Sequence, residues 1–256
     1  MIYEPILDVN QHVTKHTYKN CGVSLHFHQS IEIIYCLSGK LLASCGAEQY
    51  EIEKDEIAFF PSYFPHAVKR LENSLSITYI IPYSFFKAFT DNKIYLLFGK
   101  LDNNAINKRI LQAINDSESA LENQPNLLLQ GYVNVILGLI HHHYAEKQNF
   151  GVKIELMMKI IDYINENSKE KITLDSLSKH FGYSKYYFSR LFNKTFNCTL
   201  NFYVNQVRKN KVLSEVNDAK KITDLILENG FGTLSTYYRT KNQRPMSEET
   251  TTDNAE

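Results

Sequence analysis

The sequence contains no CxxC pair, because its four cysteines, Cys21, Cys36, Cys45 and Cys198, are all isolated. A reducing cytosol keeps such cysteines as thiols, so we expect small core residues rather than disulfides or a redox sensor. The chain also lacks any run of 18 apolar residues, and its start, MIYEPILDVNQH, has neither a basic region nor an apolar segment. These absences predict a soluble, cytoplasmic protein with no spanning helix and no signal peptide.

The chain has no net charge, because 28 Lys and Arg balance 28 Asp and Glu. That balance hides an uneven distribution. Residues 171–246 carry 13 Lys and Arg against 5 Asp and Glu, a net charge of +8, so the rest of the chain carries −8. A basic segment favours a polyanionic partner, although a solvated lysine-rich face gives the same pattern. The length of 256 residues favours two domains.

The N-terminal part, from Ser24 to Ile81, has a hydrophobic period of two. Ile31, Ile33, Tyr35 and Leu37 alternate there with Glu32, Ile34, Cys36 and Ser38. Turn residues follow at Gly39 and Lys40, and again at Lys54 and Asp55. The pattern predicts an antiparallel barrel or sandwich, which we place at residues 1–100.

The period lengthens after Asn104 and becomes helical. One predicted helix carries Ile106, Ile110, Ile114 and Leu121, and a second, opened by Pro125, carries Leu128, Tyr132, Val135 and Leu139. Two helices after a barrel predict a linking or dimerisation segment at residues 101–150, with a boundary at 145–151. Residues 151–256 are helical in pattern, and the polar tail 247–256 is expected to be disordered.

The most informative segment is ITLDSLSKHFGYSKYYFSRLFNK, beginning at Ile172. Thr173 is placed to cap one helix, Gly182 to end it, and Ser184 to cap the next. Inside the second helix Phe188, Leu191 and Phe192 point inward, which exposes Lys185, Tyr186, Ser189, Arg190, Asn193 and Lys194. This is the pattern of a recognition helix. A plain helical hairpin with a polar face fits the isolated pattern equally well.

The exposed residues have the chemistry that DNA requires. Arg190 has the reach to bind a guanine O6/N7 pair bidentately in the major groove, which admits one helix. Lys185 and Lys194, at either end of the predicted helix, are placed to hold phosphates.

Residues 161–239, beginning IDYINENSKEKITLDSLSKHFGYSKYYFSRLFNK, resemble the DNA-binding domain of the AraC/XylS family of transcription regulators. The resemblance implies two helix-turn-helix units, with FYVNQVRKNKVLSEV as the joining helix and DLILENGFGTLSTYYR as the second unit. It implies base contacts from Tyr186, Ser189 and Arg190 in the first unit, and from Ser235, Thr236 and Arg239 in the second. Two such helices would enter successive major grooves about 34 Å apart. The implied partners are double-stranded promoter DNA, RNA polymerase and a second copy of the chain.

The second unit departs from the family pattern at three positions. Ile226 stands where a small residue is usual, Asn229 where an apolar residue would pack beneath the turn, and Lys241 where a phenylalanine is expected. A missing core aromatic costs a few kcal/mol. We therefore expect the second unit to be less stable and to contribute mainly phosphate contacts.

In the first domain His26, His28, Glu32 and Gly39 read H-x-H-x3-E-x6-G, and Asp55, Pro61 and His66 follow in DEIAFFPSYFPH. This resembles the paired motifs of the cupin barrel. Residues i and i+2 of a strand share a face, so His26 and His28 are expected to point inward together, where Glu32 and His66 meet them. Three histidines and a carboxylate suit a divalent iron, manganese or zinc ion.

Two interpretations of these residues stay open. Metal-dependent cupin enzymes use such a quartet as ligands, whereas AraC-type regulators carry a related HxH signature that lines a dry or sugar-sized pocket without metal. The DNA-binding signature favours the second, as does Gly22, which precedes His26 by four positions and departs from the fuller cupin pattern. The sequence thus predicts no bound metal, no other cofactor and no catalytic residue. It predicts an effector pocket lined by His26, His28, Glu32, Tyr35 and His66.

The sequence as a whole predicts an α+β protein with a cupin-like antiparallel β-barrel, a helical linking or dimerisation segment and an all-α domain with two helix-turn-helix units. Its expected function is that of a transcription regulator controlled by a small molecule or a partner at the barrel. Two alternatives remain: a regulator without an effector, and a metal-dependent cupin enzyme fused to a helical domain.

Overall fold

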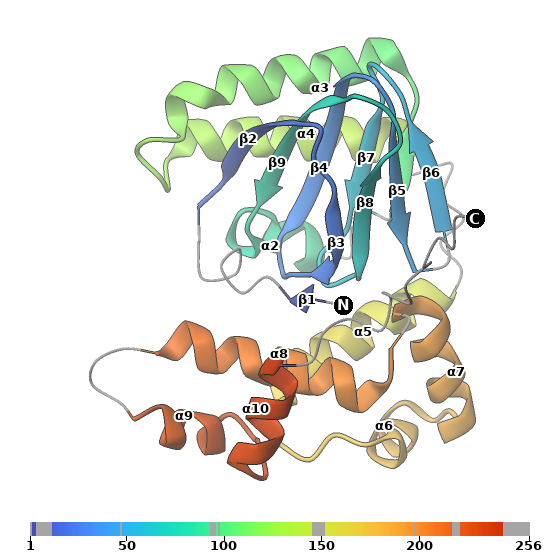
Figure 1. The fold of residues 1–256 in the computed structure, drawn as a ribbon, viewed down its shortest axis with the longest axis vertical. Helices are drawn as coiled ribbons and strands as arrows, with labels where there is room; N and C mark the ends of the chain where they lie inside the picture. The colour runs from blue at the N-terminus through green and yellow to red at the C-terminus, as the bar shows by residue number, and fades with distance from the viewer. Residues whose placement is uncertain are drawn as a thin grey trace, which may run out of the picture.

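The computed structural model describes residues 2–3, 12–46, 48–92, 96, 98–144, 152–196, 198–216 and 221–242. The predicted boundary at 145–151 and the predicted disordered tail at 247–256 lie outside these residues. Figure 1 shows a body of β-strands with helices along one side, and a separate group of helices beneath it. This arrangement confirms the α+β class and the order of a cupin-like domain before a helical one. In the described part of the chain, no helix has the length and apolar character needed to cross a membrane.

The strands form two five-stranded sheets. Sheet A has the order β1 (Ile2–Tyr3), β3 (Val23–Phe27), β8 (His66–Arg70), β5 (Leu41–Cys45) and β6 (Glu48–Ile52). Sheet B has the order β10 (Gly99–Leu101), β7 (Ile57–Phe60), β4 (Ile31–Ser38), β9 (Leu75–Ile81) and β2 (Thr14–Lys19). All neighbouring strands are antiparallel except β1 and β3.

Strand β4 is buried at every position from Ile31 to Cys36, because both faces of sheet B are covered. Its even-numbered side chains Ile34 and Cys36 join residues of sheet A in the barrel interior. Its odd-numbered side chains Ile33 and Tyr35 face outward, against the helices that cover sheet B. These helices are α2 (Tyr83–Asp91), α3 (Asn104–Asp116) and α4 (Leu127–Tyr144), with the short 3₁₀ helix η1 (Ser117–Ala120) between α3 and α4.

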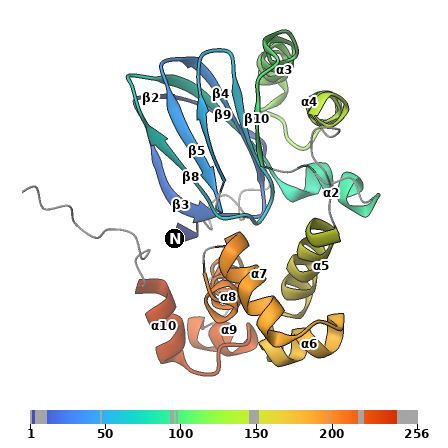
Figure 2. The same ribbon diagram turned by 90° about the vertical axis from the view of Figure 1, so that its right-hand side faces the viewer.

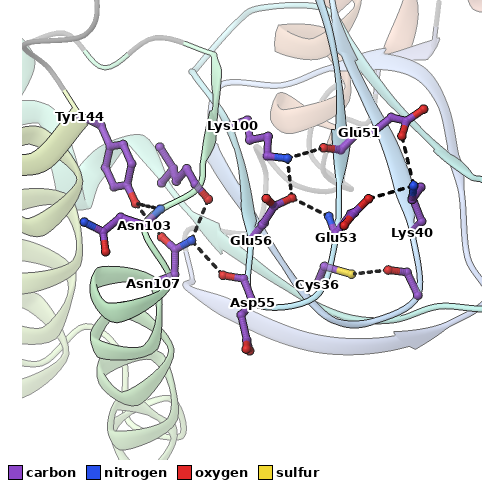
Figure 3. Close-up of polar contacts among 12 residues, drawn as sticks. Cys36, Lys40, Glu51, Glu53, Asp55, Glu56, Lys100, Asn103, Asn107 and Tyr144 are labelled. Atoms are coloured by element: carbon purple, nitrogen blue, oxygen red, sulfur yellow. Dashed lines mark hydrogen bonds and ion pairs between the residues drawn. The ribbon is translucent and has the colours of Figure 1, made fainter.

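A buried asparagine fastens α3 and α4 to the barrel, as Figure 3 shows. The Nδ2 atom of Asn107, on α3, donates to the carbonyl oxygens of Leu101 at 2.7 Å and Asp55 at 2.9 Å. Its Oδ1 accepts a hydrogen bond of 2.9 Å from the hydroxyl of Tyr144 at the end of α4. All the polar atoms of this amide are therefore used, and the two helices are tied to the turn at Asp55.

The turn after β4 is closely packed against a second turn. Gly39 has a φ of +78°, and a Cβ placed on it would lie 2.0 Å from the carbonyl oxygen of Asn73. The next residue, Ser74, forms two hydrogen bonds of 2.8 Å with Asn20. The Ser74 N–H donates to Asn20 Oδ1, and the Asn20 N–H donates to the Ser74 carbonyl oxygen. Only glycine fits this position, both for its backbone conformation and for the space available.

The described part of the C-terminal domain contains six helices. They are α5 (Val152–Asn167), α6 (Leu174–Phe181), α7 (Lys185–Phe196), α8 (Leu200–Glu215), α9 (Ile222–Glu228) and α10 (Leu234–Asn242). Helix α8 joins the pair α6 and α7 to the pair α9 and α10, which confirms the two predicted helix-turn-helix units (Figures 1 and 2).

Candidate DNA-binding surface and cupin histidine site

The first helix-turn-helix unit begins with a complete capping box. The Ser176 N–H donates to Thr173 Oγ1 at 3.1 Å, and the Thr173 N–H donates to Ser176 Oγ at 2.9 Å. Gly182 ends α6 with a φ of +76°, and Ser184 Oγ accepts a hydrogen bond of 3.2 Å from the Tyr187 N–H at the start of α7. The predicted caps are confirmed, so α7 is fixed in register and in direction.

Helix α7 has one buried and one exposed face. Phe188, Leu191 and Phe192 are buried, as predicted. The exposed face carries the residues predicted to meet DNA: Lys185, Tyr186, Arg190, Asn193 and Lys194 are exposed, and Ser189 is half-buried. Tyr186 is 73% exposed, which is unusual for a large aromatic side chain and leaves the ring available for a partner. Lys185 lies 3.8 Å from Asp175 in an exposed ion pair.

The structure adds a hollow beside α7 that the sequence analysis missed. Ser189 and Asn193 of α7 line it together with Thr173 and Thr199, which cap α6 and α8. Two helix N-termini that open beside polar side chains suit a phosphate group. The capping pattern at Thr199 was the available signal, but only the fold brings the two N-termini together.

The second unit has a much smaller core, formed by Val212, Leu225, Ile226, Phe231 and Tyr237. Asn229 is fully buried, and its Nδ2 donates to Glu215 Oε2 at 2.8 Å and to the Leu225 carbonyl at 3.0 Å. A polar pair thus stands where an apolar contact was expected, and Lys241 is exposed rather than part of the core. Of the residues predicted to contact bases, Ser235 and Arg239 are exposed and Thr236 is half-buried. The lower stability of this unit stays a prediction.

In the barrel, four predicted site residues meet at one point. His26 lies on β3, His28 directly after it, Glu32 on β4 and His66 at the start of β8. The Nε2 atoms of His26, His28 and His66 lie 3.8, 3.1 and 3.2 Å, respectively, from Glu32 Oε2. All four side chains are almost completely buried, and one potential ligand atom from each lies within 4.8 Å of the others. We call these residues the histidine quartet.

The far side of each ring fixes the state of its nitrogens. The Nδ1 atom of His26 lies 2.9 Å from the carbonyl oxygen of Ser24. The Nδ1 atom of His28 lies 3.0 Å from that of Ser30, and the Nδ1 atom of His66 lies 2.8 Å from that of Phe64. A carbonyl only accepts, so each Nδ1 carries the proton, and a neutral ring then has a lone pair at Nε2. All three Nε2 atoms face one carboxylate oxygen, Oε2 of Glu32.

Burial and proximity set the charges of the quartet. Burial raises the pKa of the Glu32 carboxyl, but the contacts with the three histidines outweigh it and hold that pKa well below its usual value. Burial, and then the neighbouring His26, lower the pKa of His66 to about 4. At neutral pH the quartet thus holds a carboxylate anion, and the ring of His66 is neutral.

Tyr35 does not belong to this group, which corrects the predicted pocket. It lies on the same strand as Glu32 but three residues away, so its ring points to the opposite face of sheet B. There its hydroxyl donates to Asp55 Oδ1 at 3.0 Å. Tyr35 is part of the core beneath α3 and α4.

Comparison with known proteins agrees with both halves of this geometry. The cupin domain profile matches residues 14–80, and the profile of bacterial regulatory helix-turn-helix proteins of the AraC family matches residues 164–205. The chain combines a cupin domain with an AraC-type DNA-binding domain. The second profile ends within α8, so the atypical second unit of this chain lies beyond the matched residues.

Curated proteins match this chain over different lengths. YdeC of Bacillus subtilis, an uncharacterized HTH-type transcriptional regulator, is 23% identical over 258 residues, which cover 89% of this chain and 84% of YdeC. The regulatory protein SoxS of Salmonella typhimurium is 27% identical over 86 residues, 33% of this chain and 80% of SoxS. Among solved structures, ToxT from Vibrio cholerae has a TM-score of 0.56 at 11% identity, covering 90% of this chain and 93% of ToxT. ToxT therefore shows the same fold.

Proposed function

We propose that this regulator binds promoter DNA sequence-selectively through α7 and α10. The observation that carries the proposal is the capped helix α7, which buries its apolar face and presents Arg190 on the exposed one. Tyr186, Ser189 and Arg190 would contact bases, while Lys185 and Lys194 would contact phosphates. Ser235, Thr236 and Arg239 would contact the second groove. RNA polymerase is the partner we propose for the DNA-bound form.

The cupin part is proposed to sense rather than to catalyse. Residues 1–100 would form the sensing barrel, 101–150 the linking and dimerisation segment and 151–256 the DNA-binding domain. The helix-turn-helix match that follows the cupin match in the same chain supports this. A small-molecule effector is also part of the proposal; one solved structure of ToxT contains a bound unsaturated fatty acid.

Arg190→Ala tests the DNA-binding function. Fluorescence anisotropy of the purified protein on DNA from its own upstream region, across a salt series, should show selective binding that weakens linearly in log salt. Loss of one bidentate base contact is worth about 1–3 kcal/mol, so Arg190→Ala is expected to weaken specific binding about 5- to 150-fold and leave nonspecific binding little changed.

Arg109→Ala is the matched control for this experiment. Arg109 is an exposed arginine on α3, so the variant removes the same charge far from the helix-turn-helix units. Its binding should equal that of the wild type. If no DNA fragment is preferred and Arg190→Ala behaves like the parent protein, the proposed function is wrong.

The quartet also fits a divalent cation, which cupin domains commonly hold. Two ligands at right angles, each about 2.1 Å from one ion, lie about 3 Å apart, close to the spacing of His28 and His66 from Glu32. Three Nε2 atoms and one carboxylate oxygen converge on one buried point, which is a donor set that a divalent cation takes. The donor geometry therefore favours the metal interpretation over the metal-free pocket expected from the sequence. The ion would be held by His26, His28, Glu32 and His66. When bound, it would offset the negative charge of the Glu32 carboxylate.

Helix α4 presents a surface suited to a second copy of the chain. Leu128 and Val135 are 57% and 52% exposed, and Tyr132 and Leu139 continue their stripe with the 4-3-4 spacing of a helix-pairing seam. We propose a homodimer through this stripe. In sedimentation equilibrium, Leu128→Lys with Val135→Lys should weaken dimerisation tenfold or more. Leu127→Lys, at an exposed leucine off the stripe, should leave it unchanged; equal effects would refute the interface.

A further inference from the structure

The cupin domain and the DNA-binding domain are joined by aromatic rings. Phe27 stacks on Tyr203 of α8, with ring centroids 5.1 Å apart and an interplanar angle of 15°. Phe64 lies against Phe196 at the end of α7, with centroids 5.5 Å apart. Phe27, Phe196 and Tyr203 are completely buried. We call these four side chains the interdomain cluster.

Both cupin residues of the interdomain cluster are direct neighbours of the histidine quartet. Phe27 stands between His26 and His28, and strand alternation turns it away from the quartet and onto Tyr203. Phe64 uses its carbonyl oxygen to accept the Nδ1 proton of His66 at 2.8 Å. A shift of any of the three rings therefore acts directly on the backbone that carries the interdomain cluster.

Tyr63 makes a second connection between the same two places. Its N–H donates to the carbonyl of His28 at 2.8 Å, and its own carbonyl accepts a hydrogen bond of 3.4 Å from the hydroxyl of Tyr203. Tyr63 has a φ of +65°, a left-handed conformation that a bulky residue seldom adopts. Such a conformation persists only where its surroundings determine it, so the segment has little freedom to absorb a movement of the quartet.

On the other side, Tyr203 contacts the buried face of the recognition helix. Its ring lies 5.5 Å from that of Phe192 and 4.9 Å from that of Phe196, measured between centroids. Both residues belong to α7, whose opposite face presents Arg190. A rigid aromatic contact thus runs from the quartet to the helix that reads DNA.

We propose that a divalent cation in the quartet controls DNA affinity by setting the position of α7 through the interdomain cluster. The proposal rests on the proposed function of both sites. Without a cation, the three Nε2 atoms lie 3.1 to 3.8 Å from Glu32 Oε2; with one, all four groups are drawn toward a shared positive charge. The backbone that carries the histidine quartet would then shift toward the ion. Phe27 and Phe64 would transmit that shift to Tyr203 and Phe196. Such coupling is reciprocal, so DNA should change the affinity for the cation by the same factor.

The test measures DNA affinity of the EDTA-treated full-length protein by anisotropy, with and without Zn²⁺ or Mn²⁺. The wild type should show a ratio of dissociation constants of about fivefold or more between the two states, as is usual for allosteric coupling. Phe27→Leu keeps an apolar side chain but loses the stack on Tyr203, so it should bind metal and DNA with a ratio of DNA dissociation constants below about twofold. Tyr203→Phe removes the hydroxyl that donates to the Tyr63 carbonyl and should also lower the ratio. Its matched control is Tyr79→Phe, which removes a buried hydroxyl in the core beneath α3 and α4 and should keep the wild-type ratio.

Hydrogen exchange on the DNA-free wild type gives a second readout that needs no variant. Metal should change the protection of α7 and α8, and should leave α3 and α4 unchanged. The inference is overturned if neither metal binds, if both ligands bind without affecting each other, or if Phe27→Leu keeps the full ratio. A protein that binds no DNA but shows metal-dependent protection of α7 would instead keep the coupling and refute the proposed function.

Discussion

Glu32→Gln is expected to weaken the binding of Zn²⁺ or Mn²⁺ by about 100-fold or more. Replacing even an outer partner of a metal ligand typically costs 10- to 100-fold, and Glu32 is the one anion among the four donors. The amide is neutral and nearly the same size, so the barrel should still fold. Equilibrium dialysis of EDTA-treated protein with elemental analysis measures the dissociation constant and the stoichiometry, which should be one ion per chain.

Glu72→Gln is the control for this experiment, since Glu72 is an exposed carboxylate in the same domain. It should bind metal as the wild type does. A ligand that binds only the native state raises the melting temperature, so metal should stabilise the wild type and Glu72→Gln but not Glu32→Gln. Equal affinity in all three proteins would show that the quartet is not the metal site and that a shared proton balances Glu32.

Gly39→Ala is expected to cost about 4 kcal/mol or more of folding free energy, an exceptional value for one methyl group. The left-handed conformation alone costs about 1–2 kcal/mol. The added Cβ would also lie 2.0 Å from the Asn73 carbonyl oxygen and 2.7 Å from Ser74 Cα. Both atoms belong to a backbone turn fastened to Asn20, so they have no room to move aside.

Gly182→Ala separates the cost of the left-handed conformation from the cost of the steric collision that are combined in Gly39→Ala. Gly182 has nearly the same φ, +76°, but no atom lies within 4 Å of the added Cβ. Its cost should stay near 1–2 kcal/mol, from conformation alone. Thermal and urea unfolding followed by circular dichroism compare the two variants with the wild type. Similar losses in both would show that the turn at Asn73 yields and that the collision is unimportant.

The helix-turn-helix unit could be predicted from sequence because its signals are local. Caps at Thr173 and Ser184, the turn at Gly182 and the buried stripe of α7 all depend on residues a few positions apart. The histidine pair was accessible for the same reason, since the two residues are separated by one position on a strand. Strand alternation also predicts that Tyr35 faces away from Glu32, because the two positions are three residues apart. It was overlooked because β4 is buried on both faces, so hydrophobicity does not mark its inner side.

Features that depend on long-range contacts could not be predicted. The hydrogen bond from Tyr203 to Tyr63 joins positions 140 residues apart, and nothing in either segment indicates the other. The role of Asn107 was hidden for the same reason, because an asparagine on a helix usually indicates an exposed surface. Its partners, Asp55 and Leu101, become neighbours only when α3 packs on sheet B.

Unequal cores in the two helix-turn-helix units imply an unequal operator. Under the proposed function α7, which is capped at its N-terminus by Ser184 and shares its core with the cupin domain, would read its half-site as a rigid helix. Among the described residues, the second unit has a core of five apolar side chains and a polar contact at Asn229, and its predicted lower stability would let α10 adjust to the groove it meets. Promoters bound by this protein would then keep one half-site nearly constant in sequence and tolerate variation in the other half-site. New target genes would arise by drift in the permissive half-site.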